Sequence, residues 1–103
     1  MILGQVIGTV WATRKDEQLV GMKLQIVAEV DLDYNVKPGF VVAVDSVGAG
    51  VGEIVLVTQG SSARQTEQTR NKPVDAVITA IVDRLDVQRQ TEAPAAEARL
   101  AEA

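Results

Sequence analysis

The side chains best suited to nucleophilic chemistry in this sequence are serines that lie close to acidic residues. Ser46 lies between Asp45 and Glu53, and Ser61 and Ser62 lie farther along the chain. A serine nucleophile needs an activating group within hydrogen-bond reach. The sequence contains no histidine and no cysteine, and no lysine is placed to activate these hydroxyls. Asp45 or Glu53 could act as a general base, but the set of residues that activates a serine nucleophile would be incomplete. We therefore do not expect an enzyme.

A second candidate group is the acidic series Glu29, Asp31 and Asp33. Alternate residues of a strand share one face, and carboxylates are ligands that suit Mg²⁺ or Ca²⁺. The spacing, however, is not that of a known cation-binding loop. We therefore prefer an outward acidic face at an antiparallel edge, and we expect neither a metal nor a cofactor.

Two further segments could bind an anion, but each has a simpler structural interpretation. Arg14 and Lys15 could contact an anion, but Arg14–Glu17 is equally a solvated, charge-balanced connection, which we prefer. Gly60–Glu67 predicts the start of a helix, whose N-terminus could bind an anion. No lysine follows in a phosphate-loop arrangement, so we expect Ser61 or Ser62 to cap this helix.

Composition limits the possible classes of protein. A chain of 103 residues has room for one domain with a modest core. The net charge of −4 argues against a nucleic-acid partner, whose binders usually carry a basic face. Trp11, Tyr34 and Phe40 are the only aromatic residues, so the core must consist of aliphatic side chains. No apolar run is long enough to span a membrane, and we expect a soluble cytoplasmic protein.

Segments rich in β-branched residues predict four strands, with a turn at Tyr34–Gly39 between the second and third. The expected strands are Gln5–Thr13, Met22–Asp33, Phe40–Val47 and Glu53–Gln59. The second has the clearest alternation, which predicts one buried and one mostly wet face. We expect the buried face to contain Met22, Leu24, Ile26, Ala28, Val30 and Leu32, and the wet face Lys23, Gln25, Val27, Glu29, Asp31 and Asp33.

The remainder of the chain predicts a fifth strand and an extension. Val77–Leu85 is apolar on both faces and also fits a helical period, but its β-branched residues favour a strand. The polar segment Gln68–Lys72 before it is expected to be an exposed connection. Thr91–Ala103 is rich in Ala and Glu and is either a frayed tail or a helix that starts near Pro94.

A glycine-spaced loop joins the third and fourth strands. Gly48, Gly50 and Gly52 lie between Phe40–Val44 and Ile54–Thr58, two runs that lack polar alternation. Glycine at every second position suits a tight path or a close neighbour. Strands that are apolar on both faces need cover on both. In so short a chain, we expect other copies of the protein to provide the second cover.

These elements predict a mainly β fold, a small five-stranded barrel of the oligonucleotide/oligosaccharide-binding type with a short helix after the fourth strand. We expect residues 1–87 to form this barrel domain and residues 88–103 to form an Ala/Glu-rich C-terminal tail. Readers of single-stranded nucleic acid place aromatic side chains on a basic groove, and this acidic, aromatic-poor chain does not fit that description.

Residues 1 to about 86 resemble the EutN/CcmL family, the vertex proteins of bacterial microcompartments, which include carboxysomes. The resemblance rests on Met1–Lys15, Leu19–Leu24, Ala43–Val57, Gly60–Arg64, Pro73–Ala76 and Ile81–Asp83. It implies a homopentamer that caps the five-fold corners of a cytoplasmic protein shell beside hexameric shell tiles, with neither nucleic acid nor membrane as a partner. A small sugar- or nucleotide-binding module is the alternative.

From this resemblance we expect Ser46–Gly52 to lie near the ring axis or a contact between subunits. The residues expected to line that contact or pore are Asp45, Ser46, Gly48, Ala49, Gly50, Gly52, Glu53, Gly60, Ser61, Ser62 and Arg64. Asp45, Glu53 and Arg64 would pair across the interface. The alternative for the loop is an ordinary glycine hairpin loop far from the axis. The alternative for the three charged residues is that they are exposed and contribute little to stability.

Overall fold

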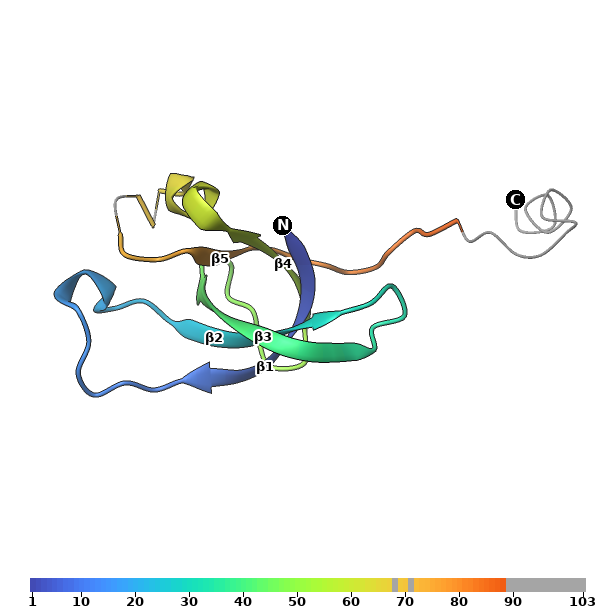
Figure 1. Ribbon diagram of the computed structural model, residues 1–103, viewed down its shortest axis with the longest axis horizontal. Helices are drawn as coiled ribbons and strands as arrows, with labels where there is room; N and C mark the ends of the chain where they lie inside the picture. The colour runs from blue at the N-terminus through green and yellow to red at the C-terminus, as the bar shows by residue number, and fades with distance from the viewer. Residues whose placement is uncertain (68, 71, 89–103) are drawn as a thin grey trace, which may run out of the picture.

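Short β-branched segments, each apolar on the side that faces the interior, build the five strands of this protein. The computed structural model describes residues 1–67, 69–70 and 72–88 (Figure 1). The strands are β1 (Ile2–Val10), β2 (Leu24–Val30), β3 (Val36–Asp45), β4 (Ile54–Gln59) and β5 (Ala76–Ile81). Two short 3₁₀ helices, η1 (Glu17–Leu19) and η2 (Gly60–Gln65), lie in the connections.

The strands form a closed barrel in the order β1-β2-β3-β5-β4, in which β4 returns to pair with β1. Neighbouring strands are antiparallel except β3 and β5, which are parallel. Closure leaves no long unpaired edge, which is how small β proteins avoid pairing with other chains. The predicted five-stranded, mainly β barrel with a short helix after the fourth strand is confirmed, and that helix is of the 3₁₀ type.

The barrel interior is aliphatic. Its central cluster contains Val6, Val27, Ala43, Ala49, Val55, Val57, Ala76 and Ile78. Strand registers show which residues share this face: Val6 lies opposite Val27, and Val27 lies opposite Val41. Because side chains alternate along a strand, the neighbouring residues of each strand point out of the barrel.

The predicted faces of the second strand are therefore only partly right: Ala28 and Val30 are buried as predicted, but Gln25, Ile26 and Val27 are on the opposite sides from those predicted. Gln25 is 0% exposed and Val27 lies in the core, whereas Ile26 points outward. Alternation in a sequence says that two faces differ, not which one is inside. The interior accepts Gln25 because its amide is hydrogen-bonded there. Of the residues that look like a core stripe in the sequence, Leu24 and Ile26 are only half-buried in the single chain and Leu32 is exposed.

Several strand limits also differ from the prediction. β2 stops at Val30 because the carboxylate of Asp31 accepts the backbone N–H groups of the next turn. β3 already begins at Val36, so the turn is shorter than expected. β5 ends at Ile81, and the predicted strand residues up to Leu85 are not part of it, although Val82 N still donates to the carbonyl of Ile54 at 2.8 Å.

A second, smaller cluster lies outside the barrel wall, where η2 covers the junction of β3 and β5. It contains Val44, Ala63 and Val77, with Met22, Leu24 and Val74 packed against it. Thr69 is fully buried beneath η2 and donates to the carbonyl of Ala63. This corrects the prediction that 68–72 is simply an exposed connection, because Thr69 is buried and hydrogen-bonded to the helix.

The predicted serine cap of this helix is also wrong. The N-cap position is occupied by Gln59, and no side chain there bonds to the helix. The possible helix near Pro94 and almost all of the predicted tail 88–103 lie outside the described residues. Within the described ranges, no helix has the length and apolar character needed to cross a membrane.

Candidate functional site

The glycine-rich segment 46–53 is a well-connected loop whose ends are held by two carboxylates. Asp45 Oδ1 accepts the backbone N–H groups of Val47 and Gly48 at 3.0 and 2.9 Å. Glu53 Oε1 accepts the N–H of Gly50 at 2.7 Å. Both acids thus have local roles as acceptors for loop N–H groups, which the sequence did not reveal.

The loop is also fastened to the barrel. Ala49 is buried in the central core, and Gln25 Nε2 donates to its carbonyl at 2.8 Å. Gln5 Nε2 donates to the carbonyl of Gly52 at 3.0 Å. Ser46 Oγ donates to the carbonyl of Ile78 at 2.6 Å, so its hydroxyl is engaged with the backbone and not with Asp45. The two glutamines were missed in the sequence, where nothing distinguishes them from ordinary polar strand residues.

The three loop glycines are not equivalent. Gly48 and Gly52 have φ of 76° and 95°, the left-handed region that other residues enter at a cost. Gly50 has no positive φ, and a Cβ added to it would lie 3.4 Å from Glu53 Oε1, an ordinary contact. A single chain therefore requires glycine at positions 48 and 52 but not at position 50.

The other predicted site residues lie on η2, after the loop. Gly60 has φ of 71° and its N–H donates to the carbonyl of Asp75 at 2.7 Å. Ser61 and Ser62 are exposed. The Arg64 guanidinium is exposed and donates to the carbonyl of Val74 at 3.3 Å. Within the described part of one chain, Arg64 is thus bonded to a carbonyl and not to either loop carboxylate.

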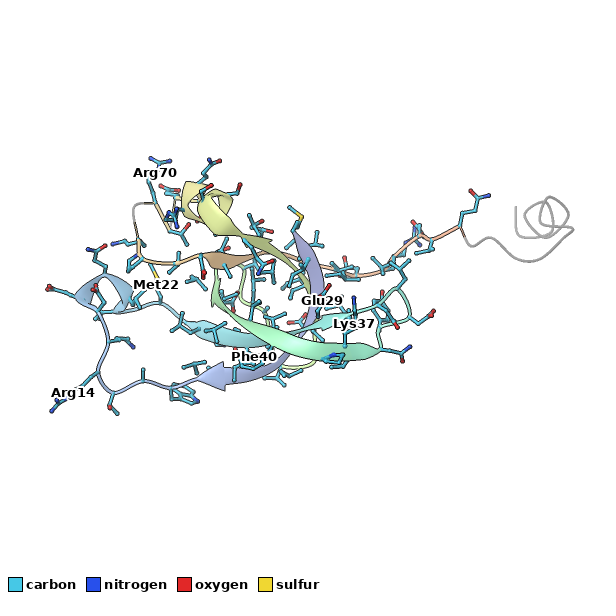
Figure 2. All side chains as sticks on the ribbon, viewed as in Figure 1. Arg14, Met22, Glu29, Lys37, Phe40 and Arg70 are labelled. Atoms are coloured by element: carbon cyan, nitrogen blue, oxygen red, sulfur yellow. The ribbon has the colours of Figure 1, made fainter. Side chains whose placement is uncertain are left out.

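The acidic series Glu29, Asp31 and Asp33 does not form a cluster of metal ligands. Asp31 Oδ1 accepts the backbone N–H groups of Asn35 and Asp33 at 3.0 and 2.8 Å. These bonds, that of Asn35 first, lower the pKa of the Asp31 carboxyl. Glu29 Oε1 lies 3.5 Å from Lys37 Nζ (Figure 2). Among the residues described, no group of three or more His, Cys, Asp or Glu side chains is arranged to hold a metal ion.

Basic side chains in the connections are exposed. Arg14 lies at the outer end of the connection between β1 and β2, and Arg70 follows η2 (Figure 2). Lys15 is exposed as well, beside Asp16 and Glu17. This is the arrangement expected of a solvated connection.

The outer surface of β2 and β3 is the most unusual feature of the single chain. Ile26 lies opposite Val42 on the outward side, and Phe40, two residues before Val42, shares that side. Ala28, which lies opposite Phe40, is buried. Phe40 is 66% exposed and Val42 is 41% exposed, and Ile26 is half-buried. We call Ile26, Phe40 and Val42 the β2–β3 flank. An antiparallel sheet with one wet face normally carries polar residues there, whereas this flank carries none.

Comparisons with known proteins agree with these features. Residues 1–83 match the model of the family described as "Ethanolamine utilisation protein EutN/carboxysome". The chain is 46% identical over 86 residues to the bacterial microcompartment shell vertex protein GrpN of Rhodospirillum rubrum, covering 84% of this chain and 97% of GrpN.

Solved structures resemble the fold closely. The structure titled "GrpN pentameric microcompartment shell protein from Rhodospirillum rubrum" superimposes with a TM-score of 0.77 at 46% identity, covering 84% of this chain and 99% of that one. The structure of Gloeobacter violaceus CcmL gives a TM-score of 0.80 at 40% identity, covering 84% and 90% of the two chains.

Proposed function

The chain belongs to the EutN/CcmL family, and on this premise we propose that it is a shell vertex protein: a homopentamer that caps the corners of a bacterial microcompartment shell in the cytoplasm. The proposed role is structural and involves no catalysed reaction. A sheet of six-fold tiles is flat, so a closed shell needs five-fold units where its facets meet. The expected neighbours in the shell are therefore hexameric shell proteins.

The observation that carries this proposal is the uncovered β2–β3 flank. Phe40 and Val42 are exposed in the single chain although they lie on regular strands of a closed barrel. Fully burying an exposed apolar side chain contributes about 1.5–3 kcal/mol. Phe40 and Val42 are partly buried already, so contact with another copy would gain a part of this for each. Cyclic association of identical chains removes this surface from water.

We further propose that the glycine loop contacts another copy or borders the central opening of the ring. Its support is the glycine at position 50, which the single chain does not require. Val47 and Val51 are exposed on the same loop, although its backbone is firmly hydrogen-bonded. A neighbouring backbone close to Gly50 would explain both the missing side chain and the exposed valines.

The alternative function, a small sugar- or nucleotide-binding module, has less support. The related proteins are named as shell vertex proteins. A hollow of about 220 Å³ borders Phe40 and Glu29, and a larger one of about 360 Å³ borders Trp11, Lys15 and Lys23. Each hollow has a single aromatic residue in its lining, and not the series of aromatic side chains on a basic groove that nucleic-acid readers of this fold use.

Co-expression with a hexameric shell protein tests the vertex role. We expect closed particles in negative-stain electron microscopy when both proteins are present, and open sheets or tubes when this chain is left out. We also expect the chain to co-purify with the particles. Closed particles of the same shape and yield without this chain would contradict the vertex role.

A further inference from the structure

We infer that the ring closes through two different walls of the barrel, with the β2–β3 flank of one copy packed against an outward face of β4 on the next. This inference rests on the proposed function, because it names the surfaces through which the copies would meet. The second face, which we call the β4 flank, consists of Leu3, Ile54 and Leu56.

Strand registers define the β4 flank in the same way as the first. Leu3 lies opposite Leu56, on the side away from the inward pair of Gly4 and Val55. Ile54 shares the outward side with Leu56, because Val55 between them is buried in the core. All three flank side chains are half-buried in the single chain. None of the outward positions that these registers define carries a charge, so the β4 flank is also suited to a dry contact.

The two flanks lie on different walls. β4 pairs with β1 and β5 but with neither β2 nor β3, and Figure 1 shows β4 and β5 above β2 and β3 in that view. The wall between β3 and β5 is already covered by η2, through Ala63 against Val44 and Val77. A ring with an odd number of identical copies needs a head-to-tail contact, in which each copy contributes two different surfaces. The two flanks meet this requirement.

The surface beside the β2–β3 flank is hollowed and could receive a side chain from the β4 flank. Beside Val42 the surface is hollowed by about 160 Å³, and the hollow is lined mainly by Leu19, Leu24, Val44, Pro73 and Val74. An aliphatic side chain of the size of Leu56 fits such a hollow, whose lining is apolar except for Asp75. Phe40 projects from the same flank and would pack over the neighbouring β4 strand.

Cross-linking tests this pairing cleanly, because the natural chain contains no cysteine. The double variant Val42→Cys/Leu56→Cys, treated with a short bis-maleimide, is expected to give a ladder of linked chains up to five in denaturing electrophoresis. The control is Val87→Cys/Leu56→Cys, because Val87 is also a valine and also 41% exposed, but lies on the segment after β5. The control is expected to remain at one chain.

A charge placed on the flank gives a second readout that does not depend on cross-linker reach. Val42→Lys is expected to raise the dissociation constant of the oligomer by at least about 100-fold, since an unpaired charge in a dry contact is strongly unfavourable. Val87→Lys should change it by less than about 3-fold. Circular dichroism of both variants verifies that the barrel remains folded.

Three results would overturn the inference. Efficient linking of the single variant Val42→Cys into dimers would mean that like surfaces meet. A wild-type pentamer whose double variant gives no ladder, or whose Val42→Lys variant associates normally, would place the contact elsewhere while leaving the proposed function standing. A wild-type protein that stays monomeric at high concentration would overturn both proposals.

Discussion

Replacing Gln25 by Leu tests the claim that a buried amide holds the glycine loop to the barrel. Gln25 is fully buried, its Nε2 donates to the carbonyl of Ala49 at 2.8 Å, and its Oε1 accepts from Thr9 Oγ1 at 2.7 Å. Leucine keeps the approximate volume and removes both bonds. The Thr9 hydroxyl can rotate to another acceptor, but the buried Ala49 carbonyl loses its side-chain partner. A buried polar group left without its partner costs about 1–3 kcal/mol.

A loss of about 2 kcal/mol corresponds to a decrease in Tm of roughly 8–16 °C for a domain of this size. The assay is thermal unfolding followed by circular dichroism at one fixed protein concentration, because association also shifts Tm. Gln5→Leu is the matched control, since Gln5 bonds to the same loop at Gly52 from an exposed position. The control should lose no more than about 1 kcal/mol. The reasoning is refuted if Gln25→Leu is no less stable than Gln5→Leu.

Three further predictions follow from the backbone and the turns. Gly48→Ala should destabilise the chain by about 1–2 kcal/mol because of the positive φ at this position, whereas Gly50→Ala should leave the free energy of unfolding unchanged. Gly50→Val should weaken the oligomer seen by size-exclusion chromatography. Normal assembly of Gly50→Val would contradict the proposed loop contact. Gly4→Ala should cost about 1–3 kcal/mol in urea unfolding, since its Cβ would lie 2.8 Å from the Ala28 carbonyl oxygen; an unchanged midpoint would show that the strands shift easily. The pKa of Asp31 is lowered in the folded chain. Its contribution to the free energy of unfolding is therefore present above the unfolded-state pKa and is lost as pH falls through the folded-state pKa. Stability measured below about pH 4 should therefore decline less steeply in Asp31→Asn than in the wild type, and equal slopes would count against the hydrogen bonds at this turn.

The number of strands and their approximate positions along the chain could be predicted because each is a β-branched run bounded by turn residues. The helix alternative for Val77–Leu85 was correctly set aside on the same ground, since β-branching suits Val77 and Ile78 to β5. Limits were harder to predict. They depend on local hydrogen bonds, such as those of Asp31, and on shifts of register such as the one between Ala28 and Val30.

The direction in which side chains point could not be predicted from alternation. Alternation places the more apolar series, Met22 to Leu32, inside; Ala28 and Val30 are buried as predicted, but Ile26 points outward. In the structure the interior takes Val27 and the hydrogen-bonded Gln25 instead. The proposed contact between copies would bury Ile26 in the assembly, which accounts for its place in the apolar series of the sequence.

The sequence singles out the loop at 46–53 by its glycines, but its internal chemistry was hidden. The bonds of Asp45 and Glu53 to loop N–H groups depend on a path that only the folded backbone defines. The anchoring glutamines lie on strands far away in the sequence. Interactions across such separations leave no mark on local spacing, so the sequence pointed to the segment and not to what holds it in place.

Native mass spectrometry of the purified chain over a dilution series tests the central claim most directly. If covering the β2–β3 flank drives a closed ring, the dominant species should have a mass of about 55 kDa, five times the 11.0 kDa chain. Intermediates of two to four chains should be scarce, because each lacks the contact that closes the ring. A species of one chain at every concentration, with Phe40 and Val42 left in water, would contradict the account.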